Sequence, residues 1–260
     1  MGDDETVSST YLEGPGPIAF AHRGGGREVP ENSRAAVEHT VALGLGYLET
    51  DVRATSDGVA VLNHDATVDR TTDGTGRVDQ LTWDQVAALR DASGARPVRL
   101  EELLGDYPAL RVNIDAKDDH GLEPLVRAIE RTGAQDRVGL ASFSDARLAR
   151  LRVRLPGVAT SLGRGDVARL VAAARLGRRP RVPGPGGGAV CVQVPTRVRG
   201  LQIVTSRFLA AAHRHGLAVH VWTIDDPGEM RRLLDLGVDG IISDRPRVLR
   251  DVLTERGAWH

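Results

Sequence analysis

The sequence predicts an α/β fold, a (β/α)8 TIM barrel with a small insertion between the second and third barrel strands. Short apolar runs alternate with stretches of helical periodicity, which is the pattern of a parallel sheet covered by helices. Eight such apolar runs occur along the chain. The length of 260 residues also suits a single barrel of this kind, which usually needs about 250 residues.

The expected strands and helices alternate from residue 18 onward. The apolar runs that predict strands span residues 18–24, 47–54, 110–117, 138–144, 158–163, 189–195, 218–224 and 239–244. The amphipathic patterns that predict helices span residues 32–44, 121–133, 145–155, 165–177, 206–216, 227–237 and 246–255. This order is that of repeated βα units.

Residues 55–109 interrupt the alternation and form the expected insertion. Asp57-Gly58 between apolar residues is a hairpin signal, so a strand over residues 59–64 is expected to fold back on the second barrel strand. A turn at this point would place His64 opposite Glu49. Two short helices are expected to follow, over residues 82–90 and 99–105.

Composition limits the classes of function. Hydrophobic residues make up 41% of the chain and charged residues 27%, as in ordinary globular proteins. The net charge of −1 provides no field that would attract nucleic acid or an anionic membrane. No run approaches the roughly 18 apolar residues of a membrane-spanning helix, and the acidic first residues lack the apolar segment of a signal peptide. We therefore expect a flexible tail over residues 1–16, one domain over residues 17–260, and a cytoplasmic protein without nucleic-acid partners or an integral membrane segment.

Polar residues gather at the carboxyl ends of the expected strands, where the active sites of such barrels lie. Glu49 and Asp51 are two residues apart on one strand, so both side chains point to the same face. The hairpin would bring His64 back toward them. The residues expected at this end of the barrel are His22, Arg23, Glu49, Asp51, His64, Asn113, Asp115, Lys117, Gln193 and Trp222.

Three of these residues form a candidate metal site. Carboxylates confined together repel one another and raise each other's pKa. A divalent cation bound by Glu49, Asp51 and Asp115 would remove this cost, and all-oxygen ligands favour Mg²⁺ or Ca²⁺ over zinc. The alternative is that the carboxylates pair with arginines of the barrel.

The remaining polar residues suit work on an anionic substrate. His22 and His64 can transfer protons near neutral pH. Arg23 and Lys117 are cations that, beside a metal, would clamp a phosphoryl group. Lys117 is the only lysine among 34 basic residues, which indicates a need for a compact ammonium. Gln193 and Trp222 are candidate substrate contacts, although Trp222 as a core residue is the alternative.

The same residues, in the same order, resemble the glycerophosphodiester phosphodiesterase family. The matching segments include AHRG at 21–24, PENS at 30–33, ETDV at 49–52, HD at 64–65, DRTTDGTG at 69–76, NIDAK at 113–117 and GVDGIISDRP at 237–246. The resemblance covers nearly the whole chain. It implies a (β/α)8 barrel with an inserted segment, and cleavage of a small-molecule glycerophosphodiester to sn-glycerol 3-phosphate and an alcohol.

The resemblance also implies a role for individual residues. It makes His22 and His64 the acid–base pair. It makes Glu49, Asp51 and Asp115 the ligands of one divalent cation, Mg²⁺ or Ca²⁺. It makes Arg23 and Lys117 the contacts to phosphate oxygens.

The chain departs from the family pattern at two positions. Asp115 stands where the family usually carries glutamate, so its shorter side chain would reach the metal from farther back. Two consequences are open: coordination through a water, or a changed preference between Mg²⁺ and Ca²⁺. Ser33 stands where threonine is common, and either hydroxyl can cap the helix that follows.

Other functions fit parts of the pattern. A phospholipase D-like or sphingomyelinase D-like enzyme of the same superfamily would form a cyclic phosphate, but it needs an apolar surface, and aromatic residues make up only 3% of this chain. A non-catalytic phosphodiester-binding barrel would have lost a catalytic histidine, whereas both are present. A phosphate-binding barrel isomerase usually has a glycine-rich phosphate loop near its last strands, which this chain lacks.

Overall fold

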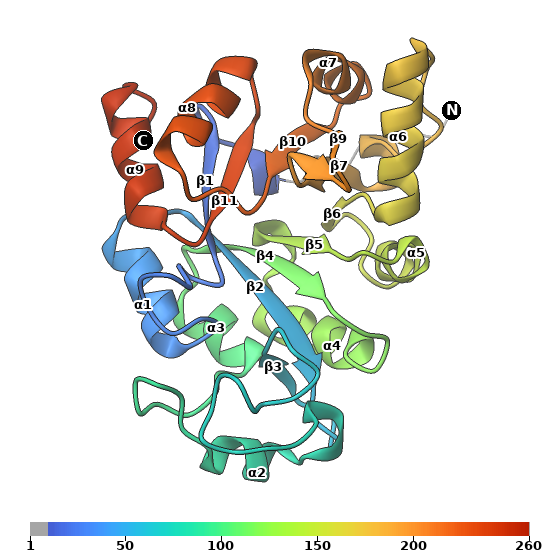
Figure 1. The fold of residues 1–260 in the computed structure, drawn as a ribbon. Coiled ribbons are helices and arrows are strands. Elements are labelled where there is room, and N and C mark those ends of the chain that lie inside the picture. The colour runs from blue at the N-terminus through green and yellow to red at the C-terminus, as the bar shows by residue number, and fades with distance from the viewer. Residues whose placement is uncertain (1–9, 260) are drawn as a thin grey trace.

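The computed structural model, which describes residues 10–259, contains eight parallel strands closed into a barrel (Figure 1). The barrel strands are β1 (Ile18–His22), β2 (Tyr47–Ala54), β4 (Arg111–Ala116), β5 (Val138–Ala141), β6 (Ala159–Ser161), β7 (Ala189–Val194), β10 (Ala218–Val221) and β11 (Gly240–Ser243). Each pairs with the next, and β11 pairs with β1, so the barrel has no free edge. The predicted (β/α)8 fold is confirmed.

Helices follow the strands and surround the barrel (Figure 1). They are α1 (Arg34–Ala42), α4 (Leu122–Thr132), α5 (Asp145–Arg154), α6 (Arg164–Leu176), α7 (Ser206–Arg214), α8 (Pro227–Leu236) and α9 (Pro246–Glu255). Ser33 caps α1, because its hydroxyl accepts the N–H of Ala36 at 3.0 Å. Buried apolar residues of the strands and helices form one large cluster, which fixes the barrel as the frame of the site.

Between β2 and β4 the chain forms additional elements. These are β3 (Ala60–Leu62), a 3-10 helix η2 (Val78–Gln80), α2 (Trp83–Ala88) and α3 (Leu100–Asp106). Strand β3 runs antiparallel to β2, with Val52 opposite Leu62. Continued by two residues, this register puts His64 across from Thr50, so the expectation of Glu49 is wrong by one residue. The reason is the connection, which contains three residues because the Thr55 N–H binds the Val59 carbonyl.

Residues 10–12 of the expected flexible tail form a helical turn that packs against the barrel. A 3-10 helix, η1 (Thr10–Leu12), closes the bottom of the barrel, and Tyr11 within it is fully buried. The Tyr47 hydroxyl donates to the Tyr11 carbonyl, and the Tyr11 ring lies against Gly139, where a Cβ would overlap it. Residues 1–9 of the expected tail lie outside the described residues. One buried tyrosine in a polar segment leaves no periodic pattern, so the sequence did not indicate this anchor.

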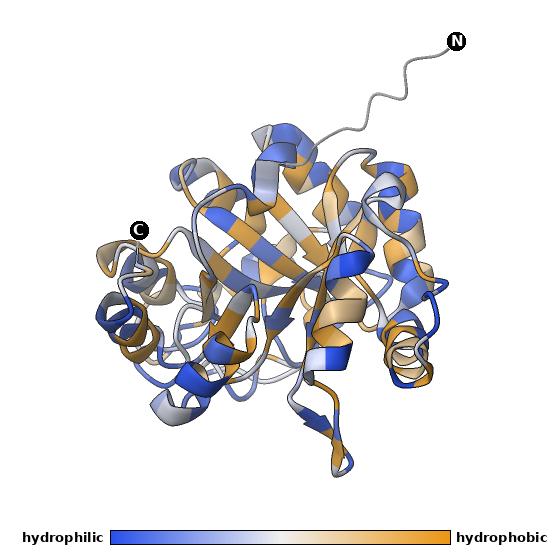
Figure 2. Ribbon diagram, turned by 90° about the horizontal axis from the view of Figure 1, so that it is seen from above, coloured by the Kyte–Doolittle hydropathy of each residue, from blue (hydrophilic) through white to orange (hydrophobic). Residues whose placement is uncertain are grey.

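A short hairpin after β7 was also not expected. It consists of β8 (Arg197–Val198) and β9 (Leu201–Gln202), and it projects beyond the surrounding helices as a ribbon of mixed polarity (Figure 2). Two further 3-10 helices, η3 (Gln135–Arg137) and η4 (Pro185–Gly187), precede β5 and β7. Over residues 10–259, no helix has the length and apolar character that crossing a membrane requires.

Candidate active site

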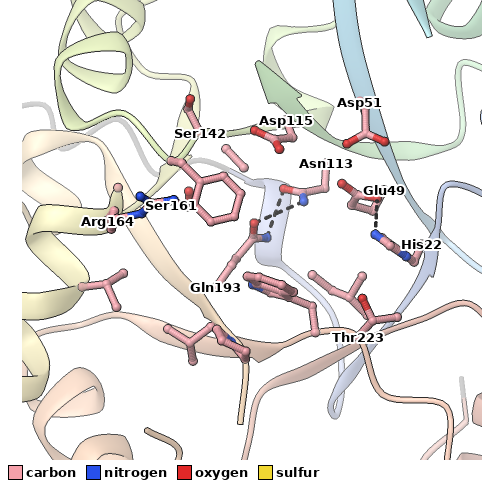
Figure 3. A pocket seen from close by; sticks show the side chains of 18 of the residues that line it. His22, Glu49, Asp51, Asn113, Asp115, Ser142, Ser161, Arg164, Gln193 and Thr223 are labelled. Carbon is pink, nitrogen blue, oxygen red and sulfur yellow. Dashed lines mark hydrogen bonds and ion pairs between the residues drawn. The ribbon is translucent and has the colours of Figure 1, made fainter. Parts of the chain in front are cut away.

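A cavity of about 650 Å³ opens among the carboxyl ends of the barrel strands (Figure 3). Strands β2 and β4 are aligned so that Glu49 lies opposite Asn113 and Asp51 lies opposite Asp115. The structure places every predicted site residue in the cavity lining, namely His22, Arg23, Glu49, Asp51, His64, Asp115, Lys117, Gln193 and Trp222.

His22, at the end of β1, is held by two carboxylates. Its Nδ1 lies 2.6 Å from Asp244 Oδ1, and its Nε2 lies 3.8 Å from Glu49 Oε2. Burial lowers the pKa of His22, but the negative charges of Glu49 and Asp244 outweigh burial, so the pKa is raised above its ordinary value. Asp244 therefore fixes the ring and favours its protonated form.

His64, which follows β3, is held by a chain of charged residues from the same loop region. Its Nδ1 lies 2.7 Å from Asp65 Oδ1, and Arg70 Nε donates to Asp65 Oδ2 at 2.6 Å. The guanidinium of Arg70 also contacts both oxygens of Glu31 at 2.8 Å. Both histidines thus present an Nδ1 occupied by an acid and keep Nε2 for other partners.

Arg23 connects this chain of charges to the carboxylates. Its Nη1 donates to Glu31 Oε1 at 2.9 Å, and its Nε lies 3.1 Å from Asp51 Oδ2. Its backbone N–H donates to Glu49 at 3.2 Å, from a residue with φ of 52°. A non-glycine residue in this left-handed region is strained, and such strain gathers at functional sites.

The three carboxylates differ in their protonation behaviour. Burial and the charge of Asp51 raise the pKa of Glu49 to about 7. Burial likewise raises the pKa of Asp115, although Lys117 opposes it. At Asp51 burial also acts upward, but Lys117 and Arg23 outweigh it and hold the pKa below its usual value. Glu49 is therefore the carboxylate whose charge is least compensated.

Lys117 lies between two of the predicted metal ligands. Its Nζ is 2.6 Å from Asp51 Oδ1 and 2.7 Å from Asp115 Oδ2. With side chains so placed, the described part of the chain holds no group of three or more His, Cys, Asp or Glu residues that could bind a metal. The donor set nevertheless fits a hard cation, because the three carboxylates are buried on adjacent strands, and burial disfavours the charged form of Glu49 and Asp115 and raises the pKa of both. A cation and the Lys117 ammonium would compete for Asp51 and Asp115.

The floor of the cavity is formed by neutral groups. Gln193 and Asn113 exchange two amide hydrogen bonds across the barrel, at 3.1 and 3.3 Å. His220, beneath them, is fully buried, and burial lowers its pKa to about 4, so it is neutral under ordinary conditions. Trp222 is partly exposed and meets the Phe143 ring edge-on, with centroids 6.0 Å apart. Trp222 therefore forms part of the cavity wall rather than of the buried core.

Several residues that hold the site were not assigned a role from the sequence. Asn32 donates to Asp51 at 2.9 Å, and Asp65, Arg70 and Glu31 orient the histidine and arginine described above. All four lie within segments that carry the family resemblance, PENS, HD and DRTTDGTG. Their place in those segments could have indicated that they belong to the site. Their hydrogen-bond partners could not be predicted, because these depend on how the loops fold.

Comparison with known proteins identifies the family. Residues 22–248 match the model of the glycerophosphoryl diester phosphodiesterase family. The chain belongs to this family. It is accordingly an enzyme of the phosphoric diester hydrolase class.

Two full-length relatives support the assignment. The chain is 41% identical over 261 residues to the protein named probable glycerophosphodiester phosphodiesterase 2 of Mycobacterium tuberculosis, covering 100% of this chain and 99% of that protein. It is 32% identical over 256 residues to the glycerophosphodiester phosphodiesterase of Caldanaerobacter subterraneus subsp. tengcongensis, covering 92% and 99% of the two chains. The family likeness therefore extends over the whole barrel.

Solved structures share the fold. The glycerophosphodiester phosphodiesterase of Agrobacterium tumefaciens superimposes with a TM-score of 0.74 at 24% identity, covering 92% of this chain and 99% of that one. A phosphodiesterase of Oleispira antarctica, solved in complex with its product sn-glycerol-3-phosphate, gives a TM-score of 0.77 at 21% identity, covering 92% and 97%. At these identities the likeness establishes the barrel architecture.

Proposed function

We propose that the enzyme hydrolyses glycerophosphodiesters to sn-glycerol 3-phosphate and an alcohol, using one divalent cation, Mg²⁺ or Ca²⁺, at Glu49, Asp51 and Asp115. One observation carries the proposal. His22 and His64 line the same cavity as the buried carboxylates, and each is bound by an acid through Nδ1. This leaves each Nε2 for proton transfer, as acid–base catalysis requires.

The residues of the cavity divide the reaction between them. One histidine accepts the proton of the attacking hydroxyl, and the other donates a proton to the departing alcohol oxygen. Arg23 and Lys117 bind the non-bridging phosphate oxygens and hold the phosphorus in line with both histidines. The bound cation supplies charge neutralisation at the phosphoryl group. The proposed sequence is attack by the glycerol 2-hydroxyl to give a cyclic phosphate, which water then opens.

The relatives support this choice of substrate. Both full-length relatives are named glycerophosphodiester phosphodiesterase, and the Oleispira protein was solved in complex with the product sn-glycerol-3-phosphate. A cavity of about 650 Å³ also has room for a small diester. These findings support a small-molecule substrate for this chain.

The test is hydrolysis of glycerophosphoglycerol by metal-stripped protein, with Mg²⁺, Ca²⁺ or EDTA added, coupled to detection of sn-glycerol 3-phosphate. Release should depend on the cation, and His22→Ala and His64→Ala should each lower kcat by at least about 100-fold. His213→Ala is the matched control, because His213 also binds an acid, Asp239 at 2.7 Å, but lies outside the cavity. It should retain full activity.

The other outcomes are distinct. Release of a cyclic phosphate alone would favour the phospholipase D-like alternative. No reaction from folded protein with either cation, together with binding of the diester, would favour the non-catalytic barrel. Activity in a His22→Ala/His64→Ala double variant would refute the acid–base mechanism.

A further inference from the structure

The active-site cavity has two halves of opposite character. Its acidic residues, Glu49, Asp51 and Asp115, lie on β2 and β4, where the cations Arg23 and Lys117 are paired with carboxylates. The other half is formed by the segments that follow β5, β6, β7 and β10, and it contains no acidic residue among those that line the cavity. Figure 3 shows the two groups on opposite sides of the opening.

The second half is mainly apolar. Its wall consists of aromatic and aliphatic side chains, namely Phe143, Leu162, Val167, Val194, Val198 and Trp222. Phe143 is 52% exposed and Val198 is 47% exposed, and both are among the few large apolar residues that face solvent. An apolar wall that lines a cavity and remains open to solvent is suited to an apolar part of a ligand.

Two arginines border this wall. Arg164 lies beyond β6, with its guanidinium 5.3 Å from the centroid of the Phe143 ring. Arg199 lies in the turn of the β8–β9 hairpin. Across residues 10–259, neither guanidinium lies within ion-pair distance of a carboxylate, unlike Arg23 and Lys117. This half of the cavity is therefore positively charged.

The backbone of the hairpin supports a functional placement of Arg199. Its φ is 48°, and Gly200 beside it has a φ of 81°. Two-residue turns with both φ angles positive favour asparagine or glycine at the first position, and arginine there is strained. Backbone strain of this kind gathers at functional sites, and here it lies at the rim of the cavity.

We propose that this half of the cavity, bordered by Arg164 and Arg199, receives the alcohol portion of the diester and selects alcohols that are apolar and carry no positive charge. The proposal rests on the proposed function, because it assigns the side of the cavity opposite the carboxylates to the leaving group. An ammonium alcohol such as choline or ethanolamine would meet two unpaired guanidinium groups and no carboxylate. Arg164 already lies over one face of the Phe143 ring, with its guanidinium carbon 5.3 Å from the ring centroid, so a second cation at that face would meet like charge.

The experiment compares two substrates of nearly equal shape. Glycerophosphocholine carries a trimethylammonium group, and the glycerophosphoryl ester of 3,3-dimethylbutanol carries a neutral tert-butyl group in its place. At low salt the kcat/KM for the neutral ester should exceed that for the choline ester by about tenfold, which corresponds to 1.4 kcal/mol. The ratio should decrease as salt rises, because exposed charges are screened.

Variants test whether the charges of the two arginines cause the difference between the esters. Arg164→Gln and Arg199→Gln should each lower the ratio about threefold, mainly by improving the choline ester. Arg197→Gln is the matched control, because Arg197 lies in the same hairpin but bonds to Gln202 and lines a different cavity. It should leave the ratio unchanged. Circular dichroism and thermal unfolding of each variant establish that it is folded.

The outcomes distinguish this proposal from the proposed function. Cleavage of neither ester by folded, metal-loaded protein would contradict the proposed function itself. Cleavage of both with equal kcat/KM, or faster cleavage of the choline ester, would overturn the selectivity proposal alone. A ratio that is unaffected by both Arg164→Gln and Arg199→Gln would show that the two arginines do not face the leaving group.

Discussion

Divalent cation binding to this enzyme should release a proton below neutral pH and not above it. The pKa of Glu49 is raised to about 7 by burial and by the charge of Asp51. Without a cation, Glu49 is therefore protonated below pH 7. A cation binds the ionised carboxylate, so binding must displace the proton.

The expected magnitude follows from this pKa. At pH 6 about 90% of Glu49 is protonated, so about 0.9 proton should leave, and at pH 8 about 0.1. The apparent affinity for the cation should fall about fivefold between pH 7 and pH 6, as the ionised fraction of Glu49 falls from about one half to about one tenth.

The same raised pKa has a consequence for stability. A raised carboxyl pKa contributes stability that is present at acid pH and lost as pH rises from about 4.5 to 7. His22, whose pKa is also raised, acts in the same direction. The metal-free protein should therefore unfold more easily at pH 8 than at pH 6, by about 1 kcal/mol from Glu49.

The assay is isothermal titration with Mg²⁺ in two buffers of different ionisation enthalpy, at pH 6 and pH 8. Glu49→Gln is the matched control, because it keeps the shape of the side chain and cannot release a proton. Equal proton release at the two pH values, or release that persists in Glu49→Gln, would show that Glu49 is not the carboxyl group that loses a proton when the cation binds.

Three further predictions concern single substitutions. Lys117→Met should strengthen Mg²⁺ binding several-fold while lowering kcat, because it removes the competing ammonium from Asp51 and Asp115; weaker binding by titration would contradict the competition. Asp115→Glu should keep kcat within about tenfold and change the relative activity with Mg²⁺ and Ca²⁺, and an unchanged preference would show that chain length here does not select the ion. Gly139→Ala should destabilise the fold by about 2 kcal/mol in urea unfolding, because its Cβ would overlap the buried Tyr11 ring, and a neutral result would mean that η1 can move aside at no cost.

The barrel could be predicted from the sequence because its strands and helices leave periodic patterns. Strand β2 lies over residues 47–54, as expected, and α9 ends at Glu255, as expected. The periodic patterns did not predict the register in which β3 pairs with β2. The connection at Ser56–Gly58 contains three residues rather than two. The Thr55 N–H binds the Val59 carbonyl, and the Thr55 hydroxyl accepts the Val59 N–H, so the register shifts by one residue.

The location of the site could also be predicted, but its internal pairing could not. Alternate residues at strand ends must share a face, and this places Glu49 and Asp51 together. Lys117 was expected to meet phosphate, whereas the structure shows its ammonium between two carboxylates. The sequence did not distinguish Arg164 and Arg199 as residues of the site, because nearly all basic residues of this chain are arginine and most of the arginines are exposed.

The arrangement of acids around the histidines makes the site dependent on closure of the barrel. His22 ends the first strand, and the acid that holds it, Asp244, follows the last strand. The pairing of β1 with β11 brings these residues together. His64 instead depends on Asp65 and Arg70, which belong to the segment between β2 and β4. One histidine is thus positioned by barrel closure and the other by the folding of a loop, so a chain that has formed only part of the barrel cannot hold both histidines ready for proton transfer.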